Sequence, residues 1–158
     1  MTASGHRIHL ATGIFERDGA LLLAASQYPN HAQPLWNLPG GRQRAGELLE
    51  ATLRRELREE ATLAVDVGPL RYVAESYDRA TDTHFVNFAF TIAATGEPRP
   101  GPDDAHVVAL AWVPYAELGR RLTVAVVREP LLAHLADPAR RYFGFADAGI
   151  SIEFADSS

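Results

Sequence analysis

The sequence contains no cysteine and no lysine, and it has no long uncharged apolar run. Without cysteine the chain can form no disulfide bond, and neither thiol catalysis nor thiolate metal ligation is available. None of its apolar stretches approaches the roughly eighteen residues of a membrane-spanning helix, so we expect no membrane insertion. Residues 1–7 lack the apolar segment of a signal peptide, and we therefore expect a cytoplasmic protein.

Basic residues are scarcer than acidic ones: fifteen arginines face twenty acids, and the formal net charge is −5. This balance argues against an extended nucleic-acid surface and against binding to an anionic membrane. Arginine suits phosphate recognition because its guanidinium group makes bidentate contacts, although a compositional bias of the source genome accounts better for most of the fifteen. The six histidines are scattered without the spacing of a zinc site.

An acidic cluster occurs in Arg55–Glu60, shortly after the turn sequence Leu38–Gly41. In a helix, Glu56, Glu59 and Glu60 would share an arc of roughly 100°. That arc overlaps the leucine-bearing side of the helix, where an uncompensated charge is costly. A divalent cation such as Mg²⁺ or Mn²⁺ is the simplest counter-charge, since both prefer oxygen ligands. We therefore predict a metal site here; the alternative is a solvated surface with i,i+4 ion pairs.

The spacing around this cluster resembles the signature of the Nudix hydrolases. In that signature, glycine and glutamate precede Arg-Glu at fixed distances, and an aliphatic residue and a Glu-Glu pair follow. The matching positions are Gly41, Glu47, Arg55, Glu56, Leu57, Glu59, Glu60 and Leu63. One position departs from the signature, because Thr62 stands where the family usually has glycine. The helix must therefore either end without that glycine or run about one residue further.

The resemblance implies a metal-dependent enzyme that hydrolyses a phosphoanhydride bond in a nucleoside diphosphate linked to another group, such as a nucleoside triphosphate or a nucleotide sugar. It implies that Glu59 and Glu60 bind Mg²⁺ or Mn²⁺, and that Glu56 is a further ligand or the base that activates water. The carbonyl of Gly40 is a candidate backbone ligand. A catalytically silent ligand-sensing domain is the alternative, but it would normally have lost some of these acids.

Other candidate residues lie around the signature. The resemblance implies that Arg55 pairs with Glu47 or Glu56 and orients them. Arg42 and Arg44 directly follow the glycine turn and could hold phosphate groups or face solvent. Acids that could join the site from a later loop are Glu97, Asp103 and Asp104, for which a solvated loop is the favoured interpretation. Side chains that could contact a base are Tyr28, Tyr77, His84 and Phe85, although core packing is their commoner role.

Hydrophobic alternation and turn signals predict a strand-rich chain with two main helices. The predicted strands are Ile8–Glu16, Ala20–Ser26, Val65–Asp78 with a kink near Gly68–Pro69, Thr83–Ala93, Val107–Val113 and Ile150–Phe154. The predicted helices are one that opens at Gly46–Glu47, a short piece at Tyr115–Leu118, and Thr123–Ala136. A hairpin turn is predicted at Asp18–Gly19 and loops at 27–37 and 95–104, while Pro130 either kinks the last helix or marks its start.

This order predicts a single α/β domain over residues 1–158 with a mixed sheet. The resemblance sharpens the prediction to the Nudix fold, in which the sheet is sandwiched between helices in an α/β/α arrangement. The segment Tyr142–Phe154 is apolar for a chain end, so it must pack on its own domain or on another subunit. We predict a homodimer to which this segment contributes; the alternative is a tail that completes the sheet of the monomer.

Overall fold

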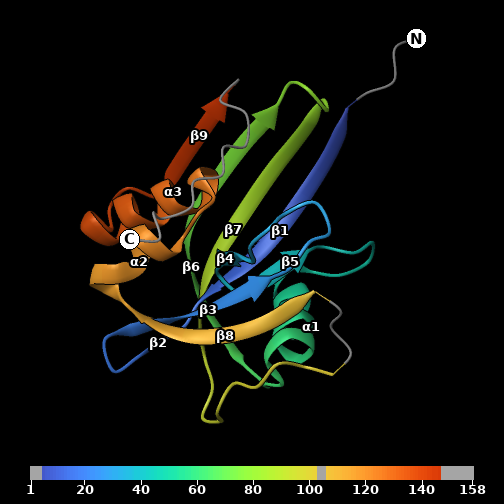
Figure 1. Cartoon of the computed structure of the whole chain (residues 1–158). Coiled ribbons are helices and arrows are strands. Elements are labelled where there is room, and N and C mark those ends of the chain that lie inside the picture. Colours follow the sequence, from blue (N-terminus) through green and yellow to red (C-terminus); the bar gives the residue numbers. More distant parts are fainter. Residues whose placement is uncertain (1–4, 103–105, 147–158) are drawn as a thin grey trace.

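The computed structural model of the chain describes residues 5–102 and 106–146, which form two sheets with helices around them (Figure 1). The strands are β1 His6–Ile14, β2 Glu16–Arg17, β3 Ala20–Ser26, β4 Leu35–Asn37, β5 Gly40–Arg42, β6 Asp66–Asp78, β7 Thr83–Ala93, β8 Val107–Pro114 and β9 Tyr142–Ala146. The helices are α1 Leu49–Ala61, the 3₁₀ helix η1 Tyr115–Glu117, α2 Leu118–Arg121 and α3 Ala125–Ala136. Within the described residues, no helix is long and apolar enough to cross a membrane.

The larger sheet has the strand order β5-β1-β7-β6-β9. Strand β1 runs parallel to β7 and antiparallel to β5, while β6 runs antiparallel to β7 and parallel to β9. In this order, β5, which carries the glycine turn, lies at one edge of the sheet, and β9 lies at the opposite edge.

The smaller sheet is built around β3, which pairs antiparallel with β2, β4 and β8. Residues Ala20–Ala25 of β3 are all buried, as expected for a central strand covered on both faces. The predicted hairpin turn between β2 and β3 is confirmed, because Asp18 and Gly19 both have positive φ angles of 52° and 77°. That conformation matches the twist of paired strands.

Helices cover both faces of the larger sheet, and each covered face has its own apolar core. On one face, Leu53 and Leu57 of α1 are fully buried with Ala11 and Ile92 of the sheet. On the other face, Leu131 of α3 packs in a cluster with Tyr72, Ala74 and Ala89. Side chains alternate between the faces of a strand, so the two cores lie on opposite sides of the sheet. The predicted α/β class with a mixed sheet between helices is therefore confirmed.

Several predicted boundaries differ from the structure. The first helix begins at Leu49, two residues after Glu47, and the segment 27–37 contains the short strand β4. Pro130 lies inside α3, so it does not mark the start of that helix. The predicted strand Ile150–Phe154 falls outside the described residues, but the preceding residues Tyr142–Ala146 form β9 and complete the chain's own sheet.

The exit of α1 also decides between the two routes left open for Thr62. Thr62 has φ 57° and ψ 37°, so it adopts the left-handed conformation and the helix does not continue through it. Its backbone N–H donates to the carbonyl of Arg58, and that of Leu63 donates to the carbonyl of Leu57. The hydroxyl of Thr62 donates to the carbonyl of Arg99 at 2.8 Å, which ties the helix end to the segment between β7 and β8.

Candidate active site

The acids of α1 are positioned by the burial of the leucines beside them. Leu53 and Leu57 are fully buried, and the adjacent Glu60 is only 7% exposed. The side chain of Glu56 is 15% exposed, whereas that of Glu59 is 38% exposed at the rim. Two of the three predicted acids therefore lie in a desolvated position, where charge requires compensation.

The glycine turn lies directly against these two acids. A Cβ atom on Gly41 would come within 2.4 Å of a carboxylate oxygen of Glu56, and one on Gly40 would come within 2.1 Å of the carbonyl oxygen of Ala11. Gly40 also has φ 146°, a conformation that side chains disfavour. Its backbone N–H donates to Glu60 at 3.4 Å. Glycine is needed at Gly40 because the backbone of strand β1 lies so close, while a side chain at Gly41 would displace the carboxylate of Glu56.

Arg55 connects the acids through a single guanidinium group. It donates to both carboxylate oxygens of Glu47, at 2.7 and 3.0 Å, in a bidentate pair. Its Nη1 atom donates to Glu56 at 3.0 Å and to Glu59 at 3.4 Å. Its Nη2 atom also donates to the carbonyl of Arg42 at 3.0 Å. The structure thus brings Arg55 to both acids that the resemblance offered as its partners.

The surroundings of Glu47 and Glu56 shift the pKa values of these two acids in opposite directions. Hydrogen bonds from Arg55 and from the backbone N–H of Arg44 lower the pKa of Glu47 to about 2. The same pairing with Glu47 raises the pKa of Arg55 further above its usual range. Burial raises the pKa of Glu56, while side-chain hydrogen bonds with Glu60 and Arg55 act against that rise. Glu47 therefore remains ionised, and Glu56 carries its charge at a cost.

The predicted convergence of all three acids is not found. In the described part of the chain, no group of three acidic or histidine side chains is arranged to hold an ion. Glu56 and Glu60 contact each other, but Glu59 pairs with Arg55. Like charges repel, and Arg55 offers Glu59 a counter-charge. The Glu56–Glu60 pair, with Arg55 on Glu56 and the backbone N–H of Gly40 on Glu60, still supplies hard oxygen donors beside a backbone turn, a set that fits Mg²⁺ or Mn²⁺.

A pocket of about 520 Å³ opens over the glycine turn and these acids. Its lining residues are Ser26, Tyr28, Gly40, Gly41, Arg42, Gln43, Arg44, Arg55, Glu56, Glu60, His106 and Val107. Both arginines predicted to hold phosphate line it, and Tyr28 stacks on His106 with ring centroids 5.4 Å apart. Sequence reasoning missed Ser26 and His106, because only the pairing of Ser26 in β3 with Val107, the first residue of β8, brings them together.

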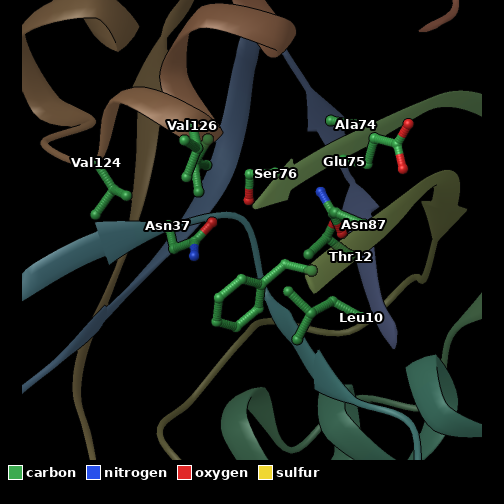
Figure 2. A pocket seen from close by; sticks show the side chains of 11 residues that line it. Leu10, Thr12, Asn37, Ala74, Glu75, Ser76, Asn87, Val124 and Val126 are labelled. Carbon is green, nitrogen blue, oxygen red and sulfur yellow. The ribbon is translucent and has the colours of Figure 1, made fainter. Parts of the chain in front are cut away.

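A second, smaller pocket of about 150 Å³ lies between the larger sheet, the end of β4 and the start of α3 (Figure 2). Its lining is mainly apolar, with Leu10, Phe85 and valines of the α3 segment. Figure 2 shows Asn37 on one side of the pocket, with Thr12 and Asn87 on the other. The Thr12 hydroxyl donates to the side-chain oxygen of Asn87 at 3.1 Å, which leaves the amide nitrogen of Asn87 as a donor.

Among the polar groups of this second pocket, the side chain of Asn37 has a buried oxygen without a hydrogen-bond partner in the described residues. Such a group is costly unless a ligand or water satisfies it. Sequence reasoning flagged Phe85 but missed Asn37 and Asn87. The available signal was the position of Asn37 at the end of Leu35–Asn37, immediately before the glycine turn.

The remaining predicted candidates lie elsewhere or outside the described residues. Glu97 forms an exposed ion pair with Arg17 at 3.2 Å and does not line the pocket over the acids. Asp103 and Asp104 fall outside the described residues. Tyr77 donates to Asp82, and His84 contacts Glu75 at 2.7 Å, at the end of the larger sheet distant from α1.

Comparison with known proteins places this geometry in a family. A model of the NUDIX domain matches residues 6–135. An ADP-ribose pyrophosphatase of Methanocaldococcus jannaschii is 33% identical over 93 residues, which cover 59% of this chain and 54% of that protein. A putative 8-oxo-dGTP diphosphatase 2 of Mycobacterium tuberculosis is 35% identical over 115 residues, which cover 69% of this chain and 74% of that protein. The chain thus spans about half the length of the archaeal relative.

Solved structures agree with the family match. The E. coli ORF135 protein superposes with a TM-score of 0.69 at 28% identity, covering 87% of this chain and 97% of that one. A MutT NUDIX hydrolase from Burkholderia pseudomallei superposes with a TM-score of 0.66 at 30% identity, covering 78% of this chain and 97% of that one. The chain belongs to the Nudix hydrolase family.

Proposed function

We propose that this protein hydrolyses a phosphoanhydride bond in a nucleoside diphosphate linked to another group, with the help of Mg²⁺ or Mn²⁺. The observation that carries the proposal is the buried Glu56–Glu60 pair under the Gly40–Gly41 turn, with Arg55 fixing the acids around it. Relatives named as an ADP-ribose pyrophosphatase and an 8-oxo-dGTP diphosphatase support the general class, a Nudix pyrophosphohydrolase.

Glu59, Glu60 and the carbonyl of Gly40 would hold the divalent cation, with Glu56 as a further ligand or as the base that activates water. When bound, such an ion neutralises phosphate charge and lowers the pKa of nearby water. Glu59 reaches the ion only if it exchanges its 3.4 Å contact with Arg55, which is longer than the contacts that Arg55 makes with Glu47. Glu56 is our candidate for the group that receives the water proton, because burial raises its pKa toward the working range of a base.

Arg55 and Glu47 act as positioning residues in this proposal. The bidentate pair fixes the guanidinium plane, so that the remaining N–H groups of Arg55 point at Glu56 and Glu59. A carboxylate held in one orientation is a better ligand or base than a mobile one. Arg42 and Arg44 line the same pocket, where they would meet the phosphate groups of the substrate.

The second pocket would receive the nucleobase. Its apolar walls suit a flat heterocycle, and the amide groups of Asn37 and Asn87 suit the donors and acceptors at a base edge. The two pockets are neighbours through the paired strands β1 and β5, because Thr12 pairs with Gly40 and Leu10 pairs with Arg42 in the sheet. A nucleotide could therefore place its base beside Asn37 and its phosphates over the glycine turn.

The test is a substrate screen with product analysis on the full chain. Nucleoside triphosphates, nucleotide sugars and dinucleoside polyphosphates are offered with millimolar Mg²⁺ or Mn²⁺, and the phosphorus-containing products are identified. We expect release of a nucleoside monophosphate from at least one class of substrate, and loss of that activity in excess EDTA. Full activity in EDTA would overturn the metal requirement. No hydrolysis of any class with either ion would contradict the proposed activity. The cytoplasmic location stays a prediction.

A further inference from the structure

A groove of about 470 Å³ lies beside the candidate active site, between the first half of β1 and the loop that joins β5 to α1. Its lining residues are Arg7, Ile8, His9, Arg42, Gln43, Arg44, Ala45, Gly46 and Glu47. We refer to it as the arginine groove. It shares Arg42, Gln43 and Arg44 with the pocket over the acids, so both hollows border this segment.

The arginine groove is lined by more basic than acidic residues, whereas the whole chain has a net negative charge. Three arginines and one histidine line it in a protein whose formal net charge is −5. Its one acid, Glu47, already accepts hydrogen bonds from Arg55, from the backbone of Arg44 and from Thr52. Within the described residues, neither Arg42 nor Arg44 forms a side-chain ion pair. The groove therefore presents cationic groups that Glu47 does not neutralise.

Hydrogen bonds on both sides hold the backbone of the segment that carries Arg42 and Arg44. Gln43 donates from its backbone N–H to the carbonyl of His9 at 2.8 Å, and from its side chain to the carbonyl of Glu47 at 2.7 Å. Glu47 in turn donates its backbone N–H to the carbonyl of Arg44 at 3.1 Å. A backbone that is already fixed lowers the entropic cost of binding an anion there.

We propose that the arginine groove binds phosphate groups of the substrate that lie beyond the cleaved bond, so that the protein prefers substrates with an extended polyphosphate. Arg42 and Arg44 would contact the phosphates next to the cleavage point, and Arg7 with His9 would contact the more distant ones. Arginine makes charge-assisted, bidentate contacts with phosphate, which suits this role. The anion class rests on the groove itself, whereas its assignment to the substrate rests on the proposed function.

The first experiment measures binding of inorganic tripolyphosphate by calorimetry, in EDTA and at low salt, with the full chain. EDTA removes any contribution from a cation at the acids. We expect Arg7→Gln to weaken the affinity at least about fivefold, because one charge-assisted contact is lost. The matched control is Arg120→Gln, an exposed arginine on α2 that pairs with Glu117, which we expect to bind tripolyphosphate as the unmodified protein does. Equal affinity of Arg7→Gln and the unmodified protein would overturn the groove as an anion site.

The second experiment separates a substrate group from a free phosphate effector. Tripolyphosphate is added to the hydrolysis of the best substrate at a fixed concentration of free Mg²⁺. We expect competitive inhibition, with an inhibition constant that rises at least about fivefold in Arg7→Gln. Non-competitive inhibition would overturn the assignment to the substrate and indicate a separate effector. If no substrate is hydrolysed, the proposed function fails, while the calorimetry still decides whether the groove binds polyphosphate.

Discussion

Arg55 and Glu47 define the site at the scale of single residues. Arg55 donates hydrogen bonds to Glu47, Glu56, Glu59 and the carbonyl of Arg42. One side chain thus links Glu47, before the helix, to the acids on the helix. The pKa of Glu47 is lowered to about 2 by this pairing, whereas burial raises the pKa of Glu56. Environments that drive the pKa values of two acids apart assign them different roles. Glu47 is suited to holding Arg55, and Glu56 to exchanging a proton or binding a cation.

Glu56→Gln tests that assignment. The amide keeps the shape of the side chain but loses the charge and the basicity, so we expect turnover to fall at least about a hundredfold. The measurement is the initial rate at saturating substrate and Mg²⁺. The matched control is Glu50→Gln on the same helix, an exposed acid that pairs with Arg54, for which we expect an unchanged rate. Turnover of Glu56→Gln within a factor of two of the unmodified protein would show that Glu56 is neither base nor essential ligand.

Glu47→Gln should reveal the pairing with Arg55 through the pH dependence of stability. The pKa of Glu47 falls from the ordinary 4.5 to about 2 in the folded chain. A lowered pKa stabilises the fold at pH values above 4.5, and this contribution disappears as the pH falls from 4.5 to about 2. We therefore expect a lower urea midpoint for Glu47→Gln than for the unmodified protein at pH 7. The gap should close as the pH is lowered through that range, and a gap that is the same at pH 7 and pH 2.5 would contradict the pairing.

At the scale of elements, the exit of α1 shows how a fold accommodates a departure from a sequence signature. Thr62 takes the left-handed conformation that glycine usually provides, and its hydroxyl bonds to the carbonyl of Arg99. A β-branched residue in this conformation is unfavourable, while a hydrogen bond contributes about 1 kcal/mol. The two effects are of similar size, so the helix can end at the same place without glycine.

Replacing Thr62 by glycine and by alanine separates the backbone effect from the hydrogen bond. Both variants lose the hydroxyl that contacts Arg99, so their difference reports the backbone alone. We expect Thr62→Gly to be more stable than Thr62→Ala by about 1 kcal/mol, because φ is 57° at this position. The measurement is the free energy of unfolding in urea. If alanine were the more stable replacement, the helix would continue through this position in solution.

The sequence predicted the long elements well and the short ones poorly. The bounds of β3 and β7 agree with the predicted Ala20–Ser26 and Thr83–Ala93, because alternation and flanking turns mark them over many residues. Strand β4 has only three residues in a segment with two prolines, and it forms because it pairs with β3. Strand β9 likewise exists through its pairing with β6. Local patterns cannot reveal strands that only a partner stabilises.

At the scale of the whole molecule, the paired strands β1 and β5 border the three hollows that we assign to one substrate. Gly40 and Gly41 lie over the acids, and Arg42 faces both the pocket and the arginine groove. The contact between Glu56 and Glu60 could be predicted, since the two acids lie one helical turn apart in a single segment. The amide groups of Asn37 and Asn87 could not, because β4, β7 and α3 must first assemble around them. Spacing within a segment is visible in a sequence, whereas contacts between distant segments are not.

The assembly of the protein is the remaining prediction at this scale. Phe143 of β9 is 7% exposed and packs edge-on against Tyr72 with ring centroids 5.7 Å apart, so the start of the apolar tail belongs to the core of its own chain. A chain that ends at Arg141 would lose this ring and unfold more easily by about 3–5 kcal/mol, so it cannot test an interface. A chain that ends at Ala146 keeps β9 and removes Ile150, Ile152 and Phe154.

We expect the full chain to be a dimer at tens of micromolar and the chain that ends at Ala146 to be a monomer, because β9 is an edge strand and the removed segment is apolar. Light scattering measures the mass of both proteins, and near-ultraviolet circular dichroism verifies that the shortened chain retains its tertiary structure. A monomeric full chain would contradict the homodimer. A dimer that persists after truncation at Ala146 would show that residues 147–158 are not needed for the interface.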